Sequence, residues 1–186
     1  MALKYNKACD CGLSRPRPCT GVPKDYTGAD VTAEVFLAVL SGNRKGVAHT
    51  KGSKKVLSPT ALDEVFVYFA DHGGPGLLGM PNPPFLTAQD LVSTLTAMAG
   101  ATSSESAFAG SEVIAGGGGG GYEQTVRGGG AGASRFKVRT FKTMTVYVEA
   151  CESGSVFDGL LRPDLGIFVE TAANPTESSY GTYCPG

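Results

Sequence analysis

The chain has 186 residues, 41% hydrophobic and 18% charged, which suits one globular domain with a packed core. Its 16 basic and 17 acidic side chains leave a formal net charge of −1, so we expect no nucleic-acid partner. No run approaches the ~18 consecutive apolar residues that cross a bilayer, so we expect no membrane partner. Residues 1–7 contain no apolar core of a signal peptide.

Three of the five cysteines, Cys9, Cys11 and Cys19, lie near the start of the chain. We expect residues 1–20 to be an irregular tail, because the two prolines within 15–18 interrupt helices and interior strands. Three thiolates without a nearby fourth ligand make a poor zinc site. The sequence therefore predicts no metal and no other cofactor, and these cysteines are interpreted as unpaired thiols.

Two short helices are predicted from capping residues that precede apolar stripes. Thr32 is a suitable N-cap for a helix over 33–41, whose apolar residues recur at i,i+4. Thr87 and Asp90 resemble a capping box for a second helix over 88–99. A polar, solvated loop is expected over 43–60.

Three apolar runs predict the strands of one sheet. The run 65–70 is continuous and rich in β-formers, which is typical of a strand covered on both faces, and a second buried strand is expected at 144–150. A third strand is expected at 167–173, and a short additional one at 77–80. Because these strands alternate with helices, we expect a parallel sheet with helices on its faces.

Residues 100–134 differ from the rest of the chain because they are rich in Gly, Ala and Ser. Ordering glycine costs more backbone entropy than ordering any other residue, and few apolar side chains are present to offset that cost. We therefore expect a disordered insertion in a domain that otherwise spans 21–186. A phosphate-binding loop is not favoured, because the flanking strand, helix and Lys-Ser/Thr step are missing.

A histidine and a cysteine follow the two strongest strands. His72 comes after the first run and Cys151 after the second. The carboxyl ends of parallel strands meet at one sheet edge, so neighbouring strands would bring these residues together. An imidazole can take the proton of a thiol, which is mostly protonated at neutral pH with a pKa of about 8.5. The backbone N–H groups of Gly73 and Cys151 are candidates to hold the developing oxyanion.

A simpler interpretation of each residue remains open at this point. A cysteine at a strand end is more often a small buried hydrophobic residue than a nucleophile. A His-Gly step is often only a turn. The pattern alone therefore makes the pair of His72 and Cys151 a hypothesis and no more.

Several separated motifs, in order along the chain, resemble the legumain family of asparagine-specific cysteine peptidases, also called asparaginyl endopeptidases or vacuolar processing enzymes. The resemblance covers roughly 21–100 and 136–184. The matching segments are Gly21–Gly28, Phe36–Leu40, Asp71–Gly73, Glu149–Ser155, Thr171–Pro175 and Glu177–Tyr180.

The resemblance implies an α/β fold of the caspase-like, three-layer type with a mostly parallel sheet. It also implies cleavage of peptides or proteins after Asn, less well after Asp, in a vacuole or lysosome. Some relatives join peptides by letting an amine replace water. Nothing in the sequence indicates which of the two reactions dominates, or the oligomeric state.

The resemblance assigns roles to individual residues. His72 and Cys151 match the catalytic pair, and Gly73 matches an oxyanion contact. Glu149 and Ser179 match residues of the pocket for the Asn side chain, whose amide offers donors and an acceptor. Asp71 matches an aspartate that can cyclise to a succinimide.

The sequence also departs from the family pattern. Residues 1–20 do not match the expected first strand, nor the segment with an Asn that orients the histidine. We therefore expect an incomplete fold that is unstable and weakly active or inactive by itself. The alternatives are an inactive or merely peptide-binding remnant and, less favoured, a relative of the catalytic subunit of the glycosyl-phosphatidylinositol transamidase.

Overall fold

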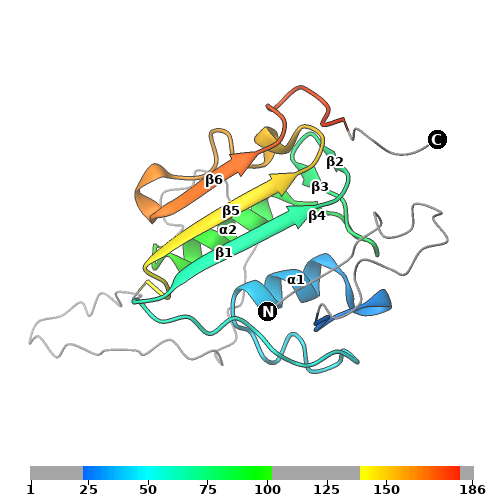
Figure 1. Cartoon of the computed structure of the whole chain (residues 1–186), viewed down its shortest axis with the longest axis vertical. Coiled ribbons are helices and arrows are strands. Elements are labelled where there is room, and N and C mark those ends of the chain that lie inside the picture. The colour runs from blue at the N-terminus through cyan, green and yellow to red at the C-terminus, as the bar shows by residue number, and fades with distance from the viewer. Residues whose placement is uncertain (1–22, 102–138, 181–186) are drawn as a thin grey trace, which may run out of the picture.

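A computed structural model describes residues 23–101 and 139–180 (Figure 1). The expected tail over 1–20, with its three cysteines, and almost all of the Gly-rich stretch lie outside these residues. In chain order the elements are η2 (Gly28–Asp30), α1 (Ala33–Leu40), β1 (Glu64–Ala70), β2 (Gly73–Gly74), β3 (Leu77–Leu78), β4 (Leu86–Thr87), α2 (Ala88–Met98), β5 (Thr143–Glu149), η3 (Ser153–Val156), η4 (Pro163–Leu165) and β6 (Ile167–Thr171).

The three long strands form a parallel sheet in the order β1-β5-β6. The register pairs Val67 with Val146 and Val146 with Val169, so all three strands run in step and end at the same edge (Figure 1). The predicted α/β class and parallel sheet are confirmed. This order makes β1 and β5 neighbours, although their paired residues are 79 positions apart in the chain.

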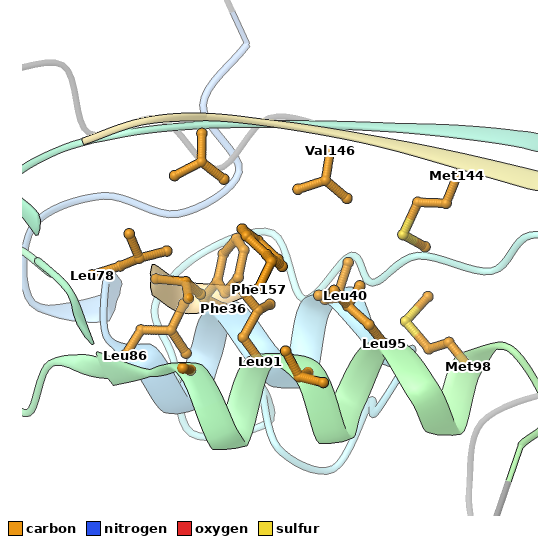
Figure 2. Close-up of a cluster of buried hydrophobic side chains, with 14 of the residues drawn as sticks. Phe36, Leu40, Leu78, Leu86, Leu91, Leu95, Met98, Met144, Val146 and Phe157 are labelled. Carbon is orange, nitrogen blue, oxygen red and sulfur yellow. The ribbon is translucent and has the colours of Figure 1, made fainter. Parts of the chain in front are cut away.

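Both helices pack against one face of this sheet. Figure 2 shows Met144 and Val146 of β5 directed toward Leu91 and Leu95 of α2. From α1, the ring of Phe36 makes an edge contact with Phe69 of β1, with centroids 6.0 Å apart. Burying a Leu or Phe side chain fully contributes about 1.5–3 kcal/mol, so this interior fixes the sheet on its helices.

The opposite face of the sheet is exposed in the part of the chain that the structure describes. Phe66 is 62% exposed, Tyr68 61% and Phe168 60%. The prediction that the strands are covered on both faces is therefore wrong for the described residues, which supply two of the three expected layers. The apolar run of β1 does not reveal this exposure, because aromatic side chains occur on both of its faces whether or not another element covers them.

The helix caps form as predicted. Thr32 Oγ1 accepts from the backbone N–H of Val35 at 3.2 Å, and Thr87 Oγ1 accepts from that of Asp90 at 3.1 Å. Gly42, with φ +75°, follows α1 in the left-handed conformation that ends many helices. Neither of the two described α-helices has the length and apolar character of a membrane span.

A small antiparallel sheet of β2, β3 and β4 follows β1 directly. It begins one residue after His72, and the predicted strand at 77–80 corresponds to β3. The backbone N–H of Gly79 donates to His72 O at 2.6 Å and closes the hairpin at its base. The histidine therefore lies at the junction of two sheets. The loop over 43–60 contains neither helix nor strand, but Val47 within it is fully buried.

Candidate active site

The ends of β1 and β5 bring the two predicted reactive residues to one edge of the sheet. Ala70 is in register with Glu149, and the backbone N–H of Asp71 donates to Glu149 O at 3.2 Å. His72 lies two residues after Ala70, and Cys151 lies two residues after Glu149, so both follow the same paired position on neighbouring strands. The predicted juxtaposition of these two chain segments is present in the structure.

Backbone contact is closest between Gly73 and Cys151. A Cβ built on Gly73 would lie 2.1 Å from Cys151 O, 3.1 Å from Cys151 N and 2.9 Å from the Ala150 Cβ. Only glycine allows this approach, because real Cβ atoms essentially never come within 3.0 Å of another heavy atom. The backbones of Gly73 and Cys151, the two residues predicted to hold an oxyanion, are thus in close contact.

The side chains of the pair are not hydrogen-bonded to each other in the described structure. The Cys151 thiol is half-buried and donates to Ser179 O at 3.6 Å. His72 is exposed, and its backbone N–H donates to Asp71 Oδ1 at 2.7 Å. Catalytic hydrogen bonds are often long or absent until substrate binds, so this arrangement is compatible with a dyad that closes on the substrate.

The two predicted pocket residues meet although they are 30 positions apart. The Ser179 hydroxyl donates to Glu149 Oε1 in a short hydrogen bond. Glu149 is the last residue of β5 and is exposed, whereas Ser179 lies on the segment that follows β6. Together with the thiol contact to Ser179 O, this bond places a carboxylate and a hydroxyl beside Cys151.

A second carboxylate, that of Glu170, lies on the same face of the sheet and has a hydrogen-bond partner of its own. Tyr147 and Glu170 are paired in register, and a hydrogen bond to the Glu170 carboxylate raises the pKa of the Tyr147 hydroxyl. Glu149 points to the same face as Tyr147, two residues further along β5. Of these two carboxylates, Glu149 is the one beside Cys151, and its hydrogen-bond partner is the Ser179 hydroxyl.

The turn after Cys151 contains residues that the sequence did not single out. Glu152 has φ +51°, and its backbone N–H donates to Glu177 O at 2.8 Å. Ser153 is fully buried, and its hydroxyl exchanges hydrogen bonds with the backbone of Ala173, at 3.2 and 3.3 Å. These contacts fix the turn to the segment that carries Ser179. The sequence places these residues in the Glu149–Ser155 motif but contains no pattern that predicts their contacts.

No group of three or more His, Cys, Asp or Glu side chains in residues 23–101 and 139–180 is arranged to hold a metal ion. The groups gathered at the candidate site are a thiol, an imidazole, backbone amides, and one carboxylate paired with a hydroxyl. This set of groups suits nucleophilic attack on a carbonyl and recognition of an uncharged polar side chain.

The chain also matches a known protein family over most of its length. A model of the peptidase C13 family matches residues 13–114 and 134–186. The chain belongs to the peptidase C13 family. The match begins at residue 13, earlier than the expected residue 21, and it leaves 115–133 in the Gly-rich stretch unmatched.

Curated relatives of this C13 chain carry the names that the resemblance implied. It is 46% identical to a vacuolar-processing enzyme beta-isozyme of Arabidopsis thaliana over 198 positions, covering all of this chain and 32% of the relative. It is 40% identical to a legumain of Canavalia ensiformis, covering 92% of this chain and 28% of the relative. The chain thus spans about a third of the length of these relatives.

Proposed function

We propose that this chain carries the catalytic centre of a cysteine endopeptidase that cleaves after Asn and, less well, after Asp. The observation that carries the proposal is the backbone contact of Gly73 with Cys151, which joins the histidine-bearing and cysteine-bearing segments. Its relatives are named vacuolar-processing enzyme and legumain. On the same grounds we propose a vacuolar location and protein or peptide substrates.

In the proposed reaction, His72 takes the proton of Cys151, and Sγ attacks the carbonyl carbon of the substrate Asn. The carbonyl electrons move to oxygen, where the N–H groups of Gly73 and Cys151 stabilise the negative charge; one such donor is worth about 3 kcal/mol. The imidazolium then protonates the leaving amine as the C–N bond breaks. Water hydrolyses the thioester, which releases the acid and restores the thiol.

The Glu149–Ser179 pair supports the proposed preference for Asn. The carboxylate is an acceptor for the two N–H bonds of a substrate amide, and the hydroxyl is a donor once it turns toward the amide oxygen. An Asp carboxylate offers no N–H and would repel Glu149 unless it is protonated. Slower reaction with Asp, and only at acid pH, follows from that repulsion.

The decisive test is covalent labelling of Cys151 by a peptidyl acyloxymethyl ketone with an Asn side chain. The thiolate forms an S–C bond to the methylene carbon, and the carboxylate leaves. We expect the purified 186-residue chain to be labelled at Cys151, with a Leu-bearing probe at least about tenfold slower, as expected from the loss of one charge-assisted hydrogen bond. An inactive remnant that only binds peptides would remain unlabelled, as would C151A.

Removing the proposed pocket carboxylate should reduce selectivity without removing the nucleophile. In Glu149→Leu the substrate amide loses a charged acceptor, which is worth about 1.5–3 kcal/mol, or roughly 10- to 100-fold in the labelling rate. Alkylation of Cys151 by iodoacetamide, which presents no Asn side chain, should change little. The matched control is Glu64→Leu, which removes an exposed carboxylate at the start of β1, at the opposite end of that strand from His72. If Glu149→Leu retained full preference for the Asn probe over the Leu probe, the proposed pocket would be wrong.

A further inference from the structure

The hydroxyl of Ser155 links the two loops of the candidate site. It accepts from the backbone N–H of Gly76 at 2.8 Å and donates to Glu152 O at 2.6 Å. Gly76 lies in the loop after His72, and Glu152 is next to Cys151. We propose that Ser155 is a positioning residue that holds the histidine-bearing loop against the cysteine-bearing turn. This inference rests on the proposed peptidase function.

On the histidine side, the contact is made at the tip of the β2–β3 hairpin. Gly76 has φ +68° and occupies the turn between the two strands. Its own carbonyl accepts from Ala88 N at 2.8 Å, which ties the tip to the start of α2. The base of the hairpin is closed by the bond from Gly79 N to His72 O. A hydrogen bond at the tip therefore restrains the hairpin whose first residues follow His72.

On the cysteine side, Ser155 supports a backbone conformation that is costly by itself. Glu152 has φ +51°, and a non-glycine residue in that region costs on the order of 1 kcal/mol or more. Its carbonyl accepts from both the hydroxyl and the backbone N–H of Ser155, at 2.6 and 2.9 Å. Because Glu152 follows Cys151 directly, its backbone conformation orients the peptide that joins the two residues.

The chemistry of the contact requires a hydroxyl. One group must accept from Gly76 N–H and, at the same time, donate to Glu152 O; a serine or threonine side chain does both. Alanine leaves the half-buried Gly76 N–H and one acceptor site of Glu152 without this partner. The hairpin can then move relative to the turn, and a misplacement of ~1 Å in reacting groups costs up to about 100-fold in rate.

The test compares variants of similar shape at position 155 in the full chain. Ser155→Thr retains the hydroxyl and adds a methyl group. Ser155→Val has the shape of that threonine, with a methyl group in place of the hydroxyl. We expect the maximal rate at which the Asn-bearing ketone labels Cys151 to fall about 10- to 100-fold in S155V and S155A. S155T should stay within about threefold of the unsubstituted chain. The probe concentration for half-maximal rate should stay within about twofold, because Glu149 and Ser179 are untouched.

Exchange of the Gly76 amide proton, followed by NMR, gives a readout that does not depend on activity. We expect protection in the unsubstituted chain and in S155T, and faster exchange in S155V and S155A. Ser41→Ala is the matched control, because the Ser41 hydroxyl donates to Leu37 O at the end of α1, on a different part of the fold.

Each outcome decides between the two claims. Equal labelling rates in S155V and S155T, or fast exchange of Gly76 in the unsubstituted chain, would overturn the positioning role while leaving the peptidase proposal intact. If the unsubstituted chain is not labelled at all, the proposed function fails, and the positioning role fails with it. If S155A does not fold, the comparison of S155T with S155V still applies.

Discussion

Replacing Gly73 with alanine is expected to reduce labelling of Cys151 by the Asn-bearing ketone by at least about 100-fold. The new methyl group would lie 2.1 Å from Cys151 O and 2.9 Å from the Ala150 Cβ. Neither neighbour is the flexible end of a long side chain, so the backbone itself must move, by roughly 1 Å. A displacement of that size between reacting groups costs about 100-fold, and the same movement separates the two proposed oxyanion donors.

The adjacent glycine provides the matched control. A Cβ on Gly74 would have only Glu152 Oε2 nearby, at 3.8 Å, which is an ordinary contact. Gly74→Ala should therefore label at a rate within a few-fold of the unsubstituted chain. Circular dichroism of both variants separates local displacement from unfolding. If G73A labelled as fast as G74A, the close approach of the two segments would have no bearing on the reaction.

Local signals explain why the helices were predictable. Thr32 and Thr87 cap their helices through bonds to residues three positions away, and these bonds require no knowledge of the rest of the fold. The strands were also correct in position, because β-branched and aromatic residues concentrate there. The burial of their side chains was not predicted correctly. The exposure of Phe66 depends on what packs against the sheet and not on the sequence of the strand itself.

The candidate site was predictable to the extent that sheet topology determines it. Parallel pairing of β1 with β5 is enough to place His72 near Cys151, and the sequence indicated both strands. The contact between Glu149 and Ser179 was anticipated only through the family resemblance, because no local pattern links residues 30 positions apart. The bond from Gly76 to Ser155 spans 79 positions, and no pattern predicted this contact, although Ser155 lies in the Glu149–Ser155 motif.

The largest effect is expected for His72→Ala. In the proposed reaction the imidazole takes the thiol proton, and such general-base assistance is worth about 100- to 10,000-fold. Backbone amides and the Glu149–Ser179 pair remain in place, so binding of the Asn-bearing ketone should be preserved while its reaction with Cys151 slows by that factor. The measurement is the maximal labelling rate at neutral pH, together with the probe concentration that gives half of it.

The chain contains one other histidine, His49, which provides the control for His72→Ala. His49 is exposed in the loop after α1, so His49→Ala removes an imidazole of similar exposure outside the candidate site. H49A should label at the rate of the unsubstituted chain. Because His72 makes no hydrogen bond to the thiol before substrate is present, its participation depends on closure around the probe. If H72A and H49A labelled equally fast, Cys151 would react without the imidazole, and the proposed dyad would be wrong.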